Sequence, residues 1–281
     1  MKKRKTTTPI AEWPFGCGIS SDEIHIGLPM SSKDDNKGAS NKPRVLILGG
    51  LGHIGRTFLQ YLVREQAASY IRLTDKAIPI TAYCSKDVEA CIKLDYVEFM
   101  QADLTKDLHL EKVFQCGPKG EGFDYIVNAA AETRNGLSED IYNNRILELS
   151  MKCAQWALKM DEKAETNKLV KWIELSSCQV YASQTRRPAK EDGAKKPWTV
   201  HAKYKLMAEE ALQTISEGDR TLPLIILRVA NVYGPGDVRG VMPRIVTAAA
   251  YQVLGEPMNF LWGADLKINT VHIEDVVNGI W

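Results

Sequence analysis

The 281-residue sequence has no apolar run of the roughly 18 residues that a bilayer-spanning helix needs. Residues 1–10 are basic and polar and lack the apolar centre of a signal peptide. We therefore predict a cytoplasmic protein without a membrane segment. The formal net charge is only +1, from 36 Lys and Arg against 35 Asp and Glu. This balance provides no broad attraction to nucleic acid, so we expect a small-molecule ligand and no nucleic-acid partner.

Cysteine clusters are also absent. The six cysteines are scattered, with no Cys-x-x-Cys pair and no histidine at metal-ligand spacing beside them. We expect reduced thiols that mostly pack in the interior, and no metal site.

Large apolar residues are scarce in residues 1–42, which are rich in Lys, Ser and Thr. Such a composition buries too little surface to offset the entropy of ordering, so this segment is predicted to be a flexible leader. We expect a dinucleotide-binding domain at 43–234 and a small substrate lobe at 235–281.

From residue 44 onward, short apolar runs alternate with amphipathic segments. The predicted strands are 44–50, 70–75, 96–100, 123–130, 170–177 and 222–230. The predicted helices are 53–65, 108–115, 138–159 and 200–216. This alternation indicates an α/β fold, a doubly wound parallel sheet of the Rossmann type with helices on both faces.

A glycine-rich turn, Gly-Gly-Leu-Gly-His-Ile-Gly at 49–55, joins the first strand to the first helix. Gly49 permits the tight turn, Gly52 lets the backbone approach a pyrophosphate, and Gly55 allows close packing of helix on strand. Amides at the helix N-terminus then face the phosphates. The predicted cofactor-binding residues of this turn are Gly49, Gly52, His53, Ile54 and Gly55.

Asp75 ends the second strand, 20 residues after Gly55. A carboxylate there can accept hydrogen bonds from the adenosine ribose and repels a 2'-phosphate, which favours NAD over NADP. Lys76 and Arg72 are nearby cations that could soften this preference.

Several segments resemble the extended short-chain dehydrogenase/reductase family of NAD-dependent nucleotide-sugar epimerases and dehydratases. These are GGLGHIGR, QADLTKD, VNAAAET, SSCQVYA, KYKLMAEEAL, LRVANVYGPGD and VHIEDVV. The resemblance runs from about residue 44 to 281. It implies that Asp103 and Leu104 flank the adenine, and that Asn128, Ala129 and Ala130 lie under the cofactor.

The same resemblance implies a catalytic Ser or Thr, a Tyr and a Lys four residues after the Tyr. Ser177 matches the serine and Lys205 matches the lysine, which also grips the nicotinamide ribose. His201, however, stands where the tyrosine is expected. Tyr204 is adjacent to Lys205, and one helical residue is about 100° of rotation, so it does not simply replace that tyrosine.

Three interpretations of the catalytic site stay open. His201 acts as the acid/base, since an imidazole transfers protons well near neutral pH. Alternatively, a local irregularity turns the Tyr204 hydroxyl into the site. In the third interpretation, the protein binds NAD without redox chemistry. Ser177 and Lys205 are pocket residues in all three.

The substrate side departs from the family as well. Asn231 matches an asparagine that contacts nucleotide-sugar phosphates, but Ile268 occupies a position where the family often carries a phosphate-binding arginine. The substrate lobe is short, so either the sequence is a fragment or the lobe is reduced to residues 235–281. Residues 138–159 and 200–216 match helices through which family members often form homodimers.

We therefore expect an oxidoreductase that transfers hydride between NAD and a carbinol of a sugar, nucleotide sugar or alcohol, with an altered proton shuttle. The alternative is a redox-inactive NAD(H)-binding scaffold or sensor.

Overall fold

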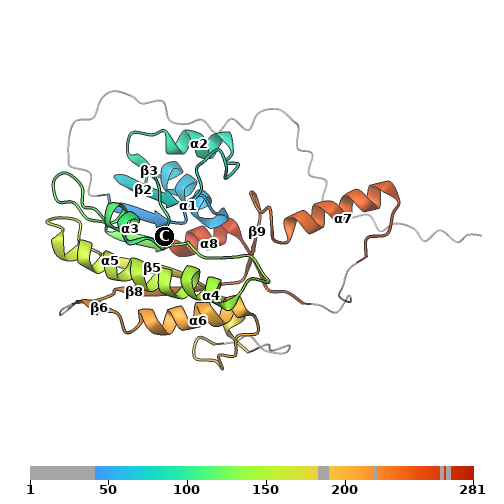
Figure 1. Cartoon of the computed structure of the whole chain (residues 1–281). Helices are drawn as coiled ribbons and strands as arrows, with labels where there is room; N and C mark the ends of the chain where they lie inside the picture. Colours follow the sequence, from blue (N-terminus) through green and yellow to red (C-terminus); the bar gives the residue numbers. More distant parts are fainter. Residues whose placement is uncertain (1–41, 183–189, 218–219, 260–262, 264–266) are drawn as a thin grey trace, which may run out of the picture. The chain divides into compact units, whose positions relative to one another are not determined.

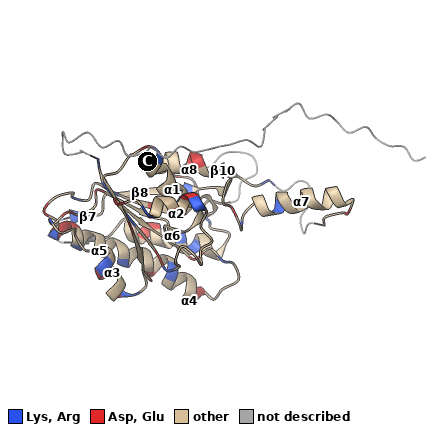
Figure 2. Cartoon of the chain, turned by 90° about the horizontal axis from the view of Figure 1, so that it is seen from above, with Lys and Arg blue, Asp and Glu red and all other residues tan. Residues whose placement is uncertain are grey.

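The computed structural model describes residues 42–182, 190–217, 220–259, 263 and 267–281. Residues 1–41 of the predicted leader lie outside the described residues. The described residues belong to one compact unit. Among the helices of the described residues, none is long and apolar enough to cross a membrane. Lys and Arg are interspersed with Asp and Glu on the helices (Figure 2).

A six-stranded sheet forms the centre of this unit, in the order β3-β2-β1-β4-β5-β8. Its strands are β1 (Arg44–Leu48), β2 (Tyr70–Asp75), β3 (Val97–Gln101), β4 (Tyr125–Asn128), β5 (Lys171–Ser177) and β8 (Leu224–Val229). All neighbouring pairs are parallel. The predicted doubly wound parallel sheet is confirmed, and all six predicted strands are present.

Helices cover both faces of the sheet (Figure 1). The helices of the described residues are α1 (His53–Arg64), α2 (Lys86–Ile92), α3 (Asp107–Val113), α4 (Glu139–Tyr142), α5 (Leu149–Lys163), α6 (Val200–Leu212), α7 (Met242–Leu254) and α8 (Ile273–Ile280). Of these, α7 buries no residue and is not one of the helices that cover the sheet. The predicted helix at 138–159 is composite, because a π-helical segment at Asn143–Glu148 joins α4 to α5. Short strand pairs lie outside the main sheet: β6 (Ser216–Glu217) with β7 (Arg220–Thr221), and β9 (Asn231–Tyr233) with β10 (Thr270–His272).

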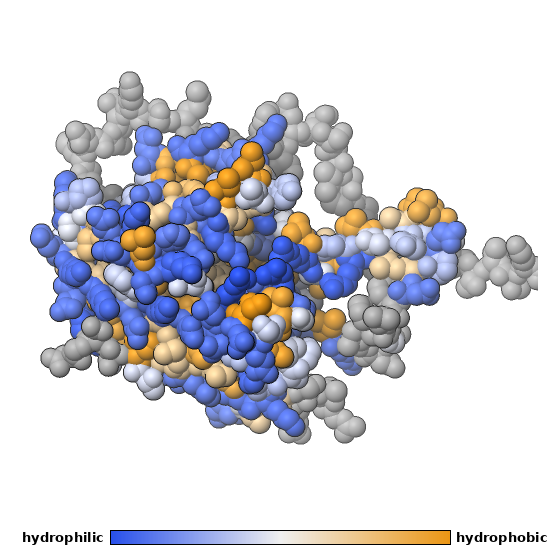
Figure 3. Space-filling model, viewed as in Figure 1, coloured by the Kyte–Doolittle hydropathy of each residue, from blue (hydrophilic) through white to orange (hydrophobic). Residues whose placement is uncertain are grey.

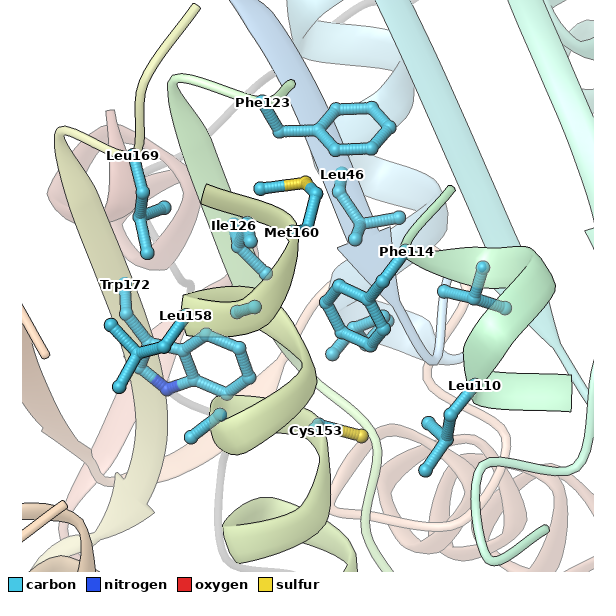
Figure 4. Packing of buried hydrophobic residues seen from close by; sticks show 14 of the residues in the cluster. Leu46, Leu110, Phe114, Phe123, Ile126, Cys153, Leu158, Met160, Leu169 and Trp172 are labelled. Carbon is cyan, nitrogen blue, oxygen red and sulfur yellow. The ribbon is translucent and has the colours of Figure 1, made fainter. Parts of the chain in front are cut away.

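Two apolar clusters hold the layers together. One lies between the sheet and α3, α5 and α6, and includes Trp172 of β5 and Leu158 of α5 (Figure 4). Leu212, at the end of α6, is also in this cluster, so it is not available for the dimer contact considered for that helix. The other cluster lies between the sheet and α1, α2 and α8.

The C-terminal lobe predicted at 235–281 divides its residues between two environments. In α8, Val276, Val277 and Ile280 pack into the main core on the α1 side of the sheet. In contrast, α7 has no buried residue, and apolar side chains are exposed on its surface (Figure 3). The lobe therefore contributes one helix to the core around the main sheet, and the boundary at residue 234 stays a prediction.

The packing of α1 against the first turn can be tested by substituting glycines. A Cβ at Gly55 would lie 2.5 Å from the Gly49 carbonyl oxygen and 2.6 Å from the Gly50 Cα. A Cβ at Gly279, in α8, would meet no atom within 4 Å. We predict that Gly55→Ala lowers the free energy of unfolding by about 1–3 kcal/mol because the backbone must move. Gly279→Ala should raise it by about 0.5–1 kcal/mol through helix propensity.

Chemical denaturation of the two variants measures both effects. The close packing is refuted if Gly55→Ala is as stable as Gly279→Ala.

Candidate functional site

The glycine-rich turn has the geometry that a phosphate-binding turn needs. Gly49 has φ +74°, and a Cβ there would lie 2.7 Å from the backbone of Ala130. Gly52 is exposed and forms the N-cap of α1, and the first amides of a helix have no acceptor within the helix itself. Ile54 packs partly against the core beneath. The turn and the segment after β4 therefore approach each other closely at one edge of the sheet.

Asp75 links β2 to this turn. One carboxylate oxygen accepts a hydrogen bond from the Leu51 amide at 3.1 Å, and the other accepts one from the Ala77 amide at 3.0 Å. A carboxylate offers about four acceptor positions, so capacity remains for ribose hydroxyls. Arg72 is directed elsewhere: its buried guanidinium bonds Glu98 and two backbone carbonyls. One of the two cations that could have favoured a 2'-phosphate is thus already engaged.

Asp103 follows β3 and shapes its own loop. Its carboxylate accepts hydrogen bonds from the Thr105 amide and hydroxyl, and its amide donates to Nδ1 of His109. Burial alone would raise the pKa of Asp103, but the bonds from Thr105, together with the charges of Lys106 and His109, lower it overall. Leu104 is buried in the core. The role of both residues beside an adenine stays a prediction.

Asn128 ends β4 as a fully buried side chain. Its amide nitrogen donates to Glu174 at 2.7 Å and to Ser150 at 3.1 Å, and its carbonyl oxygen accepts from the Ala130 amide. Ala129 continues the backbone pairing with β1. The side chain of Asn128 thus points into the protein, while the backbone after it lies against the glycine turn.

Glu174 is a site residue that the sequence analysis missed. It lies on β5 and is completely buried. Its carboxylate accepts from Asn128 at 2.7 Å, Ser150 at 3.0 Å and the indole nitrogen of Trp172 at 3.2 Å. A fourth donor, Nζ of Lys205, lies 3.4 Å away. The signal in the sequence was a single carboxylate in the apolar run Trp-Ile-Glu-Leu.

Lys205 is held on α6 by this carboxylate. Both side chains are nearly inaccessible to solvent, 5% exposed for Lys205 and 1% for Glu174. His201, Lys205 and Glu209 recur every four residues and so share one face of the helix. Glu209 makes a second buried ion pair, with Arg228 of β8. The α6 face directed at the sheet is therefore lined by charged and polar groups.

His201 occupies the first turn of α6. Burial, with a smaller effect from the Lys205 charge, lowers the pKa of its imidazole from 6.5 to about 4. Nε2 is buried and has no hydrogen-bond partner among the described residues. The imidazole is therefore neutral at pH 7, and the hydrogen-bonding capacity of its Nε2 is unused within the described residues.

Tyr204 is not brought together with Lys205. Its hydroxyl donates to Glu139 at 2.9 Å, and its ring stacks on Tyr142 with the centroids 6.2 Å apart. The hydrogen bond to Glu139 raises the pKa of the phenol. The side chain of Tyr204 thus belongs to the contact between α6 and α4.

Ser177 and Asn231 lie at the ends of different elements. Ser177 ends β5, and its hydroxyl oxygen accepts a hydrogen bond from the Gln179 amide at 3.2 Å. Asn231 begins β9 and is bonded to the carbonyl of Asn269. Ile268 is half exposed and supplies no charge at the position where the arginine was expected.

His53 makes a contact that the sequence did not reveal. Its Nε2 donates to the carbonyl oxygen of Pro235 at 2.9 Å, across 182 residues of sequence. This bond connects the N-terminus of α1 to the loop after β9.

Comparison with known proteins gives a family match over most of the chain. Residues 45–281 match the model of the NAD dependent epimerase/dehydratase family. The dTDP-D-glucose 4,6-dehydratase of Homo sapiens is 25% identical over 233 residues, which cover 79% of this chain and 63% of that protein. A putative UDP-arabinose 4-epimerase of Arabidopsis thaliana is 28% identical over 204 residues, covering 71% and 44%. The chain thus spans less than two thirds of the length of these relatives.

Solved structures share the fold. UDP-glucuronic acid 4-epimerase from Bacillus cereus, in complex with NAD, aligns with a TM-score of 0.66 at 18% identity and covers 84% of this chain and 72% of its own. UDP-N-acetylglucosamine 4-epimerase from Methanobrevibacter ruminantium aligns with a TM-score of 0.66 at 21% identity, covering 84% and 71%.

The low pKa of His201 predicts a dependence of stability on pH. The unfolded chain takes up this proton near pH 6.5, whereas the folded chain resists it until about pH 4. The free energy of unfolding should therefore fall as the pH decreases from 6.5 to 4. Between pH 7 and pH 5, the free energy of unfolding of His201→Gln should decrease by about 2 kcal/mol less than that of the wild type.

Urea denaturation at the two pH values measures this difference. Equal losses in the two proteins would mean that His201 is not held neutral by burial.

Proposed function

Because the chain belongs to the NAD dependent epimerase/dehydratase family through residues 45–281, we propose that it binds NAD and transfers hydride from a sugar carbinol to NAD, or back from NADH to the carbonyl carbon that this oxidation forms. The observation that carries the proposal is the hydrogen bond that connects the glycine turn to the end of β2. The Asp75 carboxylate bonds the Leu51 amide within a turn whose Gly49 and Gly55 leave no room for a side chain. This arrangement favours a diphosphate on the turn and a ribose at Asp75.

Different residues of the site would bind the different portions of NAD. The exposed amides around Gly52 would bind the pyrophosphate, and Asp75 would accept hydrogen bonds from the adenosine ribose. Lys205 has two ammonium hydrogens beyond the one directed at Glu174, and these would bind the nicotinamide ribose. When bound, NAD accepts or donates a hydride at C4 of its nicotinamide.

The proton must be handled by this chain. Ser177 would hydrogen-bond the reacting oxygen, and His201 would accept or return its proton, since Nε2 has no partner among the described residues. Tyr204 is the less favoured shuttle because Glu139 holds its hydroxyl.

A second candidate function is supported by the same histidine. An imidazole with a pKa of about 4 is a weak base at pH 7, where efficient general bases have a pKa nearer the working pH. This property favours a protein that binds NAD(H) as a scaffold or sensor without redox chemistry.

The substrate proposed is a sugar or nucleotide sugar. The names of the human and Bacillus cereus proteins refer to dTDP-D-glucose and UDP-glucuronic acid. Asn231 is the proposed contact to substrate phosphate, whereas Ile268 supplies no charge there. A homodimer and a cytoplasmic location stay predictions.

Cofactor choice provides the first test. We predict that NAD+ raises the melting temperature of the full chain and binds at least about tenfold more tightly than NADP+, because Asp75 repels a 2'-phosphate. Asp75→Asn keeps the side-chain size but removes the charge, and should reduce the difference in affinity between NAD+ and NADP+. Calorimetric titration measures the Kd values. A well-folded chain that binds neither nucleotide would refute the proposed function.

The proton shuttle provides the second test. With NAD+ and a panel of UDP- and dTDP-sugars, His201→Phe should lower turnover at least about 100-fold because the acid/base is lost. Tyr204→Phe, the matched control on the same helix, should keep turnover within about threefold. Formation of NADH and of epimerised sugar measures both.

A large loss of turnover in Tyr204→Phe with little loss in His201→Phe would assign the proton shuttle to Tyr204. A wild type that binds NAD+ and turns over none of the sugars would favour the scaffold.

A further inference from the structure

The buried carboxylate of Glu174 is surrounded by hydrogen-bond donors. Within the described part of the chain, four side chains direct donors at it: those of Asn128, Ser150, Trp172 and Lys205. Lys205 is the charged donor among them, and its Nζ forms an ion pair with the carboxylate. The network thus suits a negatively charged acceptor at position 174.

Lys205 is the cation that balances this charge. Among the described residues, Lys205 is the basic residue that forms an ion pair with Glu174. Both partners are buried, so water screens their field only weakly. A ligand that contacts Lys205 therefore meets a positive charge that Glu174 partly compensates instead of an isolated one.

This balance matters for the two forms of the cofactor. The nicotinamide ring of NAD+ carries a positive charge, and reduction to NADH removes it. An isolated ammonium at Lys205 would repel the oxidised ring and favour NADH, whereas a carboxylate beside that ammonium cancels the repulsion. We propose that Glu174 sets the preference of the site between NAD+ and NADH, shifting it toward the oxidised form. This inference rests on the proposed function, in which Lys205 binds the nicotinamide nucleotide.

If position 174 had only a structural role, a neutral side chain would fill it with a smaller desolvation penalty. Asn128, Ser150 and Trp172 need an acceptor, which a glutamine oxygen also provides. Burial of a carboxylate carries a desolvation penalty that the pairing must offset. The charge is therefore the property that distinguishes Glu174 from a neutral acceptor of the same size.

The test measures the ratio of Kd for NAD+ to Kd for NADH, by calorimetry on the full chain. Glu174→Gln should raise this ratio by about tenfold, because it leaves the Lys205 charge uncompensated. The matched control, Ser150→Ala, removes one hydrogen bond to the same carboxylate but keeps the charge, and should leave the ratio within about twofold of the wild type. A purely structural role would weaken binding of both forms equally.

A second variant keeps the proposal falsifiable if Glu174→Gln does not fold. Lys205→Met removes the opposite charge, so it should weaken binding of both forms but lower the ratio. An unchanged ratio in folded Glu174→Gln, or an unchanged or raised ratio in Lys205→Met, overturns the inference while leaving NAD binding intact. Failure of the wild type to bind either form overturns the proposed function itself.

Discussion

The buried ion pair between Glu174 and Lys205 is the interaction on which the rest of the site depends. The carboxylate receives hydrogen bonds from β4, from α5 and from its own strand, and the ammonium comes from α6. One side chain thus connects the strand end that lies against the glycine turn to the helix that carries the candidate catalytic groups. Loss of either partner leaves an uncompensated charge in the interior, which is strongly destabilising.

Burial limits what His201 can do. It lowers the pKa of the imidazole to about 4, with a smaller effect from the Lys205 charge, so the histidine is neutral at physiological pH. A neutral imidazole can donate or accept a hydrogen bond but is a weak base. The glycine turn therefore fits a cofactor, whereas His201 is a weak base for proton transfer. For this reason the same site supports two proposals, an enzyme and a redox-inactive scaffold.

Features set by short-range sequence patterns could be predicted from the sequence. The strand runs, the glycine turn and its relation to Asp75 depend on local spacing, and the parallel sheet followed from their alternation. The role of Glu174 could not be predicted, because a single charged residue in an apolar strand does not reveal its partners on other elements. The bond from His53 to Pro235 and the pairing of Tyr204 with Glu139 join segments far apart in sequence. Such contacts are fixed by packing, which periodicity does not encode.

A crystal structure of the full chain with bound NAD+ is the most direct measurement of the central claim. The account predicts the pyrophosphate against the amides around Gly52. It also predicts Nζ of Lys205 within about 3 Å of a hydroxyl of the nicotinamide ribose, while still paired with Glu174. A cofactor bound elsewhere, or a nicotinamide ribose that Lys205 does not contact, would contradict it.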